Sequence, residues 1–454
     1  MLIRTRFAPS PTGCLHIGNA RVAIINYLFA KKNNGRFLLR IDDTDSERST
    51  QESQDLILED LEWLSINWDE FMRQSNNFDA YIKAVEYLKS IDRLYACYET
   101  KEELQMKRKA CMSQGEVPVY DRSALALTPA DHKRLIESGI KPYWRFKLSD
   151  SDRIEWNDMI HGKIEIRLNT LSDPILVKSD GSFVYTLASV VDDINHDVTH
   201  IVRGDDHITN TAVQVDLFRA LGKVAPFFAH IPLLFSTDDK QDISKRTESP
   251  LSIVNMREEG ILPKVIFNVL ATMGTSENVT YNNTIEALAK RFSFDKISLA
   301  SPKFDIDNLR LLNRKAIAEK SFDDVRSELM RLRIGDASAV FWDVIKGNIT
   351  YIKDAVIWYQ AFYERIETFE EDKQFLEQML ETLIQINIDR IDFDQWIYDM
   401  KRISGRRDKE LLHPIRMILT GKEKGPELRY IVQLMGYERV KNRIRNNIRV
   451  NSSR

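Results

Sequence analysis

Strand-like and helix-like segments alternate through residues 1–95, and this order restricts the possible folds more than any other feature of the chain. LIRTRFA begins the series, and the apolar residues of the next segment, ARVAIINYLFAKK, recur at helical spacing. Gly35 then stands where a helix C-cap residue belongs. A second strand, RFLLRID, and two amphipathic helices, QDLILEDLEWL and DAYIKAVEYLKSI, complete the region. This order predicts a parallel sheet with helices packed on its faces.

The pattern changes between about residues 96 and 184. Thr100 and Glu103 can form a capping box at the start of a helix, TKEELQMKRKA. Short β-like pieces follow, and Asp180-Gly181 between β-rich runs predicts a hairpin turn. The α/β rhythm resumes with VTHIVRG, TNTAVQVDLFRALG and FFAHIPLLF. We therefore interpret residues 96–184 as an α+β module inserted into an α/β domain.

Helical periodicity dominates from about residue 260 onward, which predicts an all-α C-terminal region in a chain of 454 residues with several domains. The charge is uneven: residues 401–454 hold 15 Lys or Arg against 5 Asp or Glu. This excess of +10 within an overall charge of -3 leaves -13 for residues 1–400. A basic end on an acidic chain indicates a polyanionic partner there, and the alternative is a solvated basic helix face.

Several classes of protein are disfavoured by what the sequence lacks. It has no apolar run of about 18 residues or more that could span a bilayer, and MLIRTRFAP is not a signal segment. We expect a cytoplasmic protein that does not associate with membranes. The cysteines Cys14, Cys97 and Cys111 have neither metal-ligand nor disulfide spacing, so we expect reduced thiols.

The stretch APSPTGCLHIGNAR, residues 8–21, lies between the first strand and the first helix. In an open parallel sheet, ligands bind beyond the carboxyl ends of the strands, where a helix N-terminus offers free N–H groups. Gly13 and Gly18 would let the backbone approach an anion, and His16 and Asn19 can donate to phosphate oxygens. The spacing is neither GxGxxG nor a P-loop. The stretch is therefore either a phosphate site or a turn-rich loop that caps a helix.

A second polar segment, DKQDISKRTES, follows the last predicted strand at residues 239–249. Its Ser244, Lys245 and Arg246 could fold over the same crevice and place cations on phosphate groups. The alternative is an exposed basic turn.

Together these segments resemble the paired signature motifs of class I aminoacyl-tRNA synthetases. HIGN at 16–19 corresponds to the HIGH motif and DISKR at 242–246 to the KMSKS motif. The order and spacing of further segments are similar to those of bacterial-type glutamyl-tRNA synthetases, and the similarity extends over nearly the whole chain. These segments are TRFAPSPTGCLHIGNAR, LLRIDDTD, DGSFVYTLASVVDD, HIVRGDDHITNT, HIPLLF, ISKR and HPIRMILTGKEKGPEL.

The resemblance implies a multidomain fold. A Rossmann-like catalytic domain would comprise residues 1–95 and 185–240, and residues 96–184 would form an inserted acceptor-end-binding module. Residues 241–310 would be a stem-contact region with the KMSKS-like loop, and residues 311–454 a helical anticodon-binding region. Glutaminyl-tRNA synthetases are a poorer match, because their C-terminal regions are β-barrels.

The same resemblance implies ATP-dependent attachment of L-glutamate to tRNA-Glu through glutamyl-adenylate, by a monomer that uses ATP with Mg²⁺. A close alternative makes glutamyl-tRNA-Gln for later amidation. A paralogue that binds tRNA or nucleotide without catalysis would be expected to lose His16 or Lys245, and both are present.

Site residues carried over from the resemblance fall into two groups. A ligand with two carboxylates and one ammonium needs arginines and one acid around it. The expected glutamate-binding residues are Arg6, Ala8, Ser10, Asp42, Tyr185 and Arg203. The expected ATP-binding residues are Thr12, His16, Gly18, Asn19, Ser244, Lys245 and Arg246, of which His16, Asn19 and Lys245 would be catalytic.

The chain departs from the family pattern at three places. Asp42 stands where the family usually has glutamate, so its contact with the ammonium would be longer or bridged by water. Asp242 replaces a lysine, which removes one cation near the phosphates. Some relatives begin a zinc site with Cys-x-Cys, but this chain has Cys97 and Glu99, so we predict no structural zinc and no other metal site.

Overall fold

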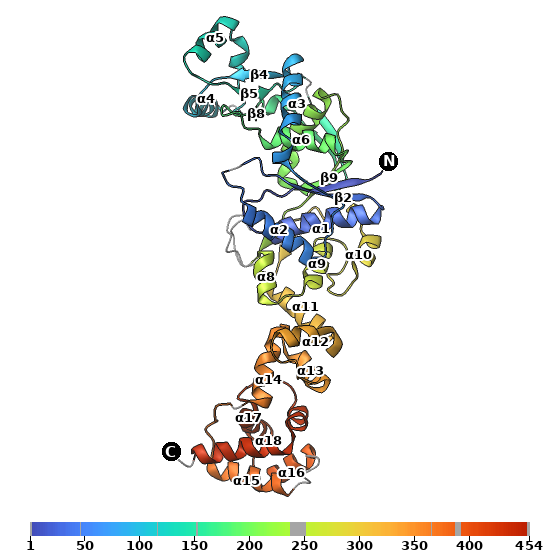
Figure 1. Ribbon diagram of the computed structural model, residues 1–454, viewed down its shortest axis with the longest axis vertical. Helices are drawn as coiled ribbons and strands as arrows, with labels where there is room; N and C mark the ends of the chain where they lie inside the picture. The colour runs from blue at the N-terminus through green and yellow to red at the C-terminus, as the bar shows by residue number, and fades with distance from the viewer. Residues whose placement is uncertain are drawn as a thin grey trace. The chain divides into compact units, whose positions relative to one another are not determined.

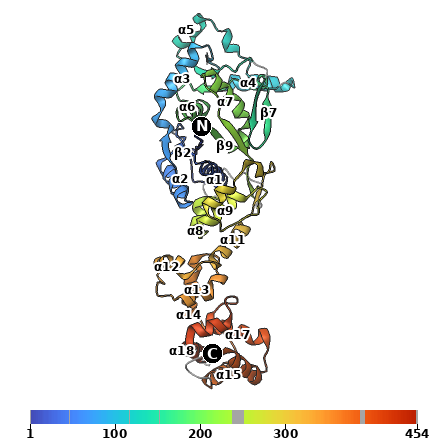
Figure 2. The same cartoon turned by 90° about the vertical axis from the view of Figure 1, so that its right-hand side faces the viewer.

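A computed structural model describes residues 2–45, 47–115, 117–150, 153–236, 251–364, 366–385 and 392–451. The chain forms two compact units, one of residues 1–258 with 266–306 and one of residues 259–265 with 307–454. Figures 1 and 2 show strands and helices mixed in the first unit and helices throughout the second. The predicted class, a mixed α/β catalytic part with an insertion followed by an all-α part, is confirmed.

A parallel three-stranded sheet opens the first unit. Its strands pair in the order β1 (Arg4–Phe7), β2 (Arg36–Ile41) and β3 (Glu70–Arg73). Helix α1 (Ile17–Lys32) joins β1 to β2, and α2 (Gln51–Trp63) joins β2 to β3. All residues of β2 except the first are buried, as expected of a strand between helical layers. The predicted strand–helix alternation is confirmed here.

A second sheet continues beside the first. Its order is β7 (Gly162–Ile166), β6 (Ile154–Asp158), β10 (Phe227–Ile231) and β9 (His200–Gly204), and only the β6–β7 pair is antiparallel. The Thr199 N–H donates to the Arg4 carbonyl oxygen at 2.9 Å, which places the start of β9 next to β1. Helix α6 (Tyr185–Asn195) precedes β9, and α7 (Ile208–Ala220) joins β9 to β10.

The strands β6 and β7 fall within the range predicted for the inserted module, 96–184, yet they pair with β10 of the main domain. Local β propensity predicts a strand but not the sheet that the strand joins, because the partner is distant in sequence. A separate antiparallel sheet holds β4 (Leu94–Cys97), β5 (Tyr143–Phe146) and β8 (Ile175–Val177). Helices α3 (Phe78–Ser90), α4 (Lys101–Ser113) and α5 (Pro129–Glu137) accompany it. The domain boundaries remain a prediction.

Two local predictions in the insertion are borne out and one is only partly so. The capping box of Thr100 and Glu103 starts α4. Gly181 has φ 88° and its N–H donates to the Lys178 carbonyl at 2.9 Å, so the predicted turn is present. The second arm of the hairpin is reduced to a single bridge at Phe183, because α6 begins at Tyr185.

The prediction that Gly35 is the C-cap residue of α1 is wrong. Asn33 is the C-cap and Asn34 adopts the left-handed conformation, with φ 50°. Gly35 follows, and its N–H donates to the Ala30 carbonyl at 2.9 Å. Glycine is needed there for a different reason, since a Cβ would lie 2.4 Å from the Ile3 carbonyl oxygen.

Residues 251–306 add short elements after the two sheets. They contribute α8 (Ile253–Glu259), α9 (Pro263–Thr272), α10 (Ile285–Arg291) and β12 (Lys303–Phe304), which pairs with β11 (Phe235–Ser236).

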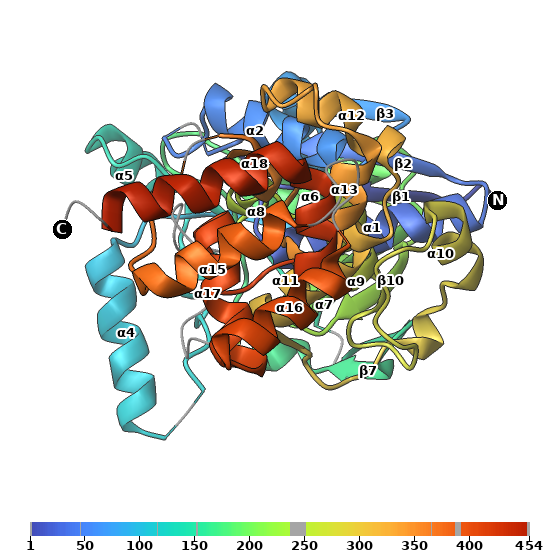
Figure 3. The same ribbon diagram turned by 90° about the horizontal axis from the view of Figure 1, so that it is seen from below.

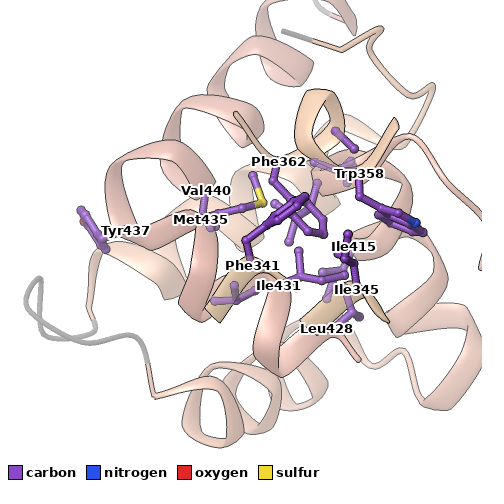
Figure 4. Packing of buried hydrophobic residues seen from close by; sticks show 14 of the residues in the cluster. Phe341, Ile345, Trp358, Phe362, Ile415, Leu428, Ile431, Met435, Tyr437 and Val440 are labelled. Carbon is purple, nitrogen blue, oxygen red and sulfur yellow. The ribbon is translucent and has the colours of Figure 1, made fainter. Parts of the chain in front are cut away.

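The second unit is built mainly from α-helices in the ranges described, with two short 3-10 helices at Lys346–Asn348 and Ile352–Asp354. The α-helices are α11 (Ile306–Ala318), α12 (Phe322–Arg331), α13 (Ala339–Ile345), α14 (Ala355–Tyr363), α15 (Lys373–Ile384), α16 (Phe393–Ser404), α17 (Asp408–Thr420) and α18 (Leu428–Asn451). Figure 3 shows α18 lying along α15 and α17. The buried cluster in Figure 4 joins Phe341 of α13, Phe362 of α14 and Ile431 of α18. No helix in the described ranges has both the length and the apolar character required to cross a membrane.

Candidate active site

A cavity of about 410 Å³ lies in the first unit, where the chain leaves β1, β9 and β10. Its wall also includes the start of α1 and the start of α6. This is the region in which an open α/β sheet accommodates ligands. The cavity brings together nine predicted site residues, namely Arg6, Ala8, Ser10, Thr12, His16, Gly18, Asn19, Tyr185 and Arg203.

The predicted residues Ser244, Lys245 and Arg246, like Asp242, lie outside the described residues. The chain on either side of this segment is next to the cavity. Leu234 lines the cavity wall before the segment. After it, Leu251 accepts a hydrogen bond from the Ile17 N–H at 3.1 Å, and the Ile253 N–H donates to Leu15 at 2.8 Å.

His16 caps the N-terminus of α1. Its Nδ1 accepts hydrogen bonds from the backbone N–H groups of Gly18, at 3.1 Å, and Asn19, at 3.4 Å. Burial lowers the pKa of His16, so the ring is neutral at pH 7 and carries its proton on Nε2. A Cβ on Gly18 would lie 2.9 Å from Cε1 of His16, so this ring position requires glycine at 18. The first turn of α1 contains no acidic residue, which favours an anion there.

Arg203 reaches the cavity from β9. Its Nη1 donates to the Tyr185 hydroxyl at 3.3 Å and its Nη2 to Thr211 Oγ1 at 2.6 Å. Its buried Nε has no hydrogen-bond partner in the part of the chain that the structure describes. A buried N–H without an acceptor is costly. The guanidinium group as a whole places a positive charge at the cavity wall, which favours an anionic ligand there.

Side chains behind Arg203 hold it in place. Thr211 Oγ1 is 2.8 Å from His230 Nε2, and His230 Nδ1 is 2.5 Å from Asp158 Oδ2. Burial lowers the pKa of His230, and hydrogen bonding with His230 helps to lower the pKa of Asp158. None of these supporting residues was predicted as a site residue from the sequence. Thr211 and His230 lie within the quoted segments HIVRGDDHITNT and HIPLLF, but Asp158 had no distinguishing local signal.

The cavity wall is otherwise rich in cations. Arg6 is buried, and its Nε donates to Asp193 Oδ1 at 3.3 Å. Arg21 also lines the cavity and donates to the Pro232 carbonyl at 2.8 Å. Burial lowers the pKa of His207 to about 4, so its ring is neutral at pH 7. The described lining contains three arginines, Arg6, Arg21 and Arg203, and one acidic residue, Asp206. This excess of positive charge favours an anionic ligand.

Asp42 does not line this cavity. Both of its carboxylate oxygens are bound by Arg40, from Nε at 2.6 Å and from Nη2 at 3.3 Å. Burial raises the pKa of Asp42 to about 6, although Arg40 acts in the opposite direction. Arg40 Nη1 also donates to Asp193 at 2.8 Å, and Asp193 contacts Arg6. Asp42 is therefore connected to the cavity through a buried ionic network, and its predicted contact with an ammonium group remains untested.

Cys97 and Glu99, at the position where some relatives begin a zinc site, belong to a hydrogen-bonded cluster in the inserted module. The carboxylate of Glu99 accepts from the hydroxyls of Tyr120, at 2.7 Å, and Tyr143, at 3.1 Å. Cys97 Sγ lies 3.6 Å from the Tyr120 hydroxyl. Within the described ranges, no group of three or more His, Cys, Asp or Glu side chains could hold a metal ion. The absence of structural zinc stays a prediction.

Comparison with known proteins gives consistent matches over the chain. Residues 2–311 match the family described as "tRNA synthetases class I (E and Q), catalytic domain", and residues 338–448 match "Anticodon binding domain". The chain is 43% identical over 441 residues to "Glutamate--tRNA ligase 2" of Hyphomonas neptunium, covering 97% of this chain and 98% of that protein. It is 42% identical over 444 residues to "Glutamate--tRNA ligase 1" of Maricaulis maris, covering 98% and 99%. The crystal structure of a glutamate tRNA ligase from Elizabethkingia meningosepticum in complex with its amino acid aligns over 99% of both chains, with a TM-score of 0.86 and 28% identity.

Proposed function

Since this chain belongs to the class I aminoacyl-tRNA synthetases, among the glutamate–tRNA ligases, we propose that it attaches L-glutamate to tRNA-Glu in two ATP-dependent steps. The observation that carries this proposal is the cavity itself. It combines two buried guanidinium groups, Arg6 and Arg203, with the capped N-terminus of α1 at His16. These two halves suit a dicarboxylate and a polyphosphate respectively.

Glutamate would bind on the β1 and β9 side of the cavity. The guanidinium group of Arg203 would pair with one carboxylate, and the Tyr185 hydroxyl, 3.3 Å from Arg203 Nη1, would add a hydrogen bond. Arg6 would pair with the other carboxylate while Asp193 holds its Nε. Ala8 and Ser10 lie along the same wall. Asp42 would receive the ammonium group of glutamate, which requires its carboxylate to turn from Arg40 toward the substrate.

ATP would bind on the α1 side. His16 would donate from Nε2 to a phosphate oxygen, with Asn19 and Thr12 contributing further donors and Gly18 giving access to the backbone. Lys245, with Ser244 and Arg246, would hold the pyrophosphate, and the chain beside this segment contacts Ile17 through Leu251. Mg²⁺ would accompany ATP and offset phosphate charge, without a dedicated protein cage.

The first step forms a bond between a glutamate α-carboxylate oxygen and the α-phosphorus of ATP and breaks the bond to the β-phosphate oxygen, releasing pyrophosphate. In the second step the terminal 2′-hydroxyl of tRNA attacks the activated carbonyl and AMP leaves. The residues of the cavity would orient the reactants and stabilise phosphate charge without forming a covalent intermediate. The helical unit would bind the anticodon.

Purified tRNA-Glu and tRNA-Gln transcripts, each offered labelled glutamate, test this function. We expect glutamate to be esterified to tRNA-Glu. Additional charging of tRNA-Gln would identify the enzyme as non-discriminating, and charging of tRNA-Gln alone would identify it as tRNA-Gln-directed. Glutamine is the control amino acid. Charging by glutamine, or failure to charge either transcript, would contradict the proposal.

A further inference from the structure

Three buried side chains behind the cavity wall form a hydrogen-bonded chain that ends on Arg203. They are Thr211 of α7, His230 of β10 and Asp158 of β6, and they form the Arg203 support. None of them is part of the described cavity lining, so a ligand in the cavity would not touch them. Asp158 comes from residues 96–184, the segment expected to be an inserted module. Strand β6 pairs with β10, and β10 pairs with β9, the strand that carries Arg203.

The protonation states of Asp158 and His230 give this chain one direction. Although burial opposes it, hydrogen bonds from His230 and from the His161 N–H lower the pKa of Asp158, so its carboxylate is ionised and only accepts. Burial lowers the pKa of His230, so its ring is neutral at pH 7. The single ring proton is therefore on Nδ1, which donates to Asp158 Oδ2 at 2.5 Å. Nε2 is left as an acceptor, 2.8 Å from Thr211 Oγ1.

Thr211 transmits this direction to Arg203. A hydroxyl has one hydrogen, and Thr211 gives it to His230 Nε2, which leaves the oxygen lone pairs for Arg203. Arg203 Nη2 donates to Thr211 Oγ1 at 2.6 Å, and Nη1 donates to the Tyr185 hydroxyl at 3.3 Å. Two fixed nitrogens define the plane of a guanidinium group. Because a planar fork pairs well with a carboxylate only in a narrow range of orientations, this plane matters for a carboxylate ligand.

We propose that the Arg203 support acts as a set of positioning residues, which fix the guanidinium plane of Arg203 for a carboxylate of glutamate. This inference rests on the proposed function, because glutamate is the ligand that Arg203 would hold. A purely structural role would also require buried polar groups to be paired. The two roles differ in what a variant loses. Positioning predicts a selective loss of glutamate binding, whereas a structural role predicts lower stability without any selective effect on glutamate.

Thr211→Val and Thr211→Ser form a matched pair that tests the hydroxyl. Valine has nearly the same shape as threonine but lacks the hydroxyl, and serine retains it. We expect Thr211→Val to raise KM for glutamate roughly tenfold with KM for ATP unchanged, and Thr211→Ser to keep both values close to those of the parent. Thr272→Val is the control for loss of a buried hydroxyl, since Thr272 Oγ1 donates to the Asn268 carbonyl of α9 at 2.7 Å. Melting curves check that each variant is folded.

Asp158→Asn tests the direction of the chain. An amide in place of the carboxylate can donate to His230 Nδ1, which moves the ring proton to Nε2. Nε2 then competes with Arg203 for Thr211 Oγ1, and the hydroxyl hydrogen turns to the His207 carbonyl oxygen, 3.2 Å from Oγ1. We expect a KM for glutamate between those of the parent and Thr211→Val. This variant also decides the question if Thr211→Val does not fold.

Titration calorimetry gives the Kd for glutamate independently of tRNA charging. A parent-like KM and Kd for glutamate in folded Thr211→Val or Asp158→Asn, or equal rises in KM for glutamate and ATP, would overturn the positioning role. A glutamate KM raised as much in Thr272→Val would overturn it as well. A parent that binds glutamate but does not charge tRNA would contradict the proposed function alone, because the Kd comparison still tests the Arg203 support. A parent that does not bind glutamate would overturn both.

Discussion

At the residue scale, His16 links local folding to chemistry. Its Nδ1 caps α1, and the same hydrogen bonds leave the Nε2 proton for a ligand. Burial favours the neutral ring that this arrangement requires. Gly18 permits it, since a side chain there would displace the imidazole. The motif is therefore both a helix cap and a phosphate-binding candidate, the two readings that the sequence left open.

The variant Gly18→Ala tests whether the ring position matters. Its Cβ would lie 2.9 Å from His16 Cε1, so the ring must move. We expect kcat for glutamate attachment to fall about 100-fold, with little change in melting temperature, and His16→Ala to show a similar loss. Parent-like kcat in a folded Gly18→Ala protein would show that the ring position is unimportant.

Arg203→Lys tests the guanidinium at the glutamate wall. Lysine keeps the charge but cannot replace three hydrogen-bonding nitrogens in a fixed plane. We expect KM for glutamate to rise roughly 30-fold or more, with a smaller change in KM for ATP. Arg36→Lys, at an exposed arginine of β2, serves as the control in steady-state assays. Equal KM values for glutamate in both variants would exclude the assigned role of Arg203.

The sequence predicted residues that line the cavity, but not the buried residues that hold them in place. Motif order indicated the residues of the cavity wall, because these occupy short segments with recognisable spacing. The partners that position them could not be predicted. Asp193 binds Arg6 across 187 positions of sequence, and His230 meets Asp158 across 72. Asp42 is bound by Arg40, two residues earlier, and Arg40 also binds Asp193, 153 positions later. This distant contact orients Arg40, so the local motif did not indicate that Asp42 is paired.

At the element scale, α2 and α8 are joined by a buried carboxylate. Asp60 of α2 is fully buried, and Arg257 Nη1 of α8 lies 3.5 Å from its Oδ1. Burial raises the pKa of Asp60 to about 7, and Arg257 offsets this only in part. Helix α8 follows directly after residues 251 and 252, which pair with the segment around His16.

The Asp60 pKa predicts how stability depends on pH. An acid whose pKa is higher in the folded than in the unfolded state binds its proton preferentially when folded. Its stabilising contribution is therefore complete below about pH 4 and is lost as the pH rises through about 7. Asp60→Asn should flatten the pH dependence of the melting temperature between pH 4 and 8 and melt higher than the parent at pH 8. Asp55→Asn, at an exposed position on α2, should leave the profile unchanged. A parent-like profile in Asp60→Asn would contradict the assignment.

The turn between α17 and α18 depends on a close approach to α14. A Cβ on Gly425 would lie 2.0 Å from Cη2 of Trp358. Gly425→Ala should therefore destabilise the second unit by roughly 1–3 kcal/mol in denaturant unfolding. Gly347→Ala is the control, since its Cβ would have no heavy atom within 4 Å. Equal stability of the two variants would show that the turn can shift without cost.

Elements were predictable from sequence where the signal is local. Amphipathic periodicity located α2 and α3, and the capping box located the start of α4. Sheet membership was not predictable for β6, which pairs with β10 about 70 residues later. The role of Gly35 was misassigned because its need for glycine comes from the carbonyl of Ile3, a tertiary contact.

At the scale of the whole molecule, the candidate active site and the match to the anticodon-binding domain lie in different units. The first carries the cavity and all described cavity residues, and the second carries the match to the anticodon-binding domain. The excess of +10 over residues 401–454 falls in the second unit, where a polyanion such as tRNA is expected to bind. Each unit also has its own buried hydrophobic cluster.

In the proposed reaction, the cavity activates glutamate by attack of its α-carboxylate on the α-phosphate of ATP. ATP labelled at the α-phosphate, incubated with the enzyme, glutamate and tRNA-Glu, tests it most directly. We expect one labelled AMP to be released for each glutamate esterified to tRNA, and no AMP when glutamate is omitted. Formation of ADP in place of AMP, or AMP release that does not depend on glutamate, would contradict it.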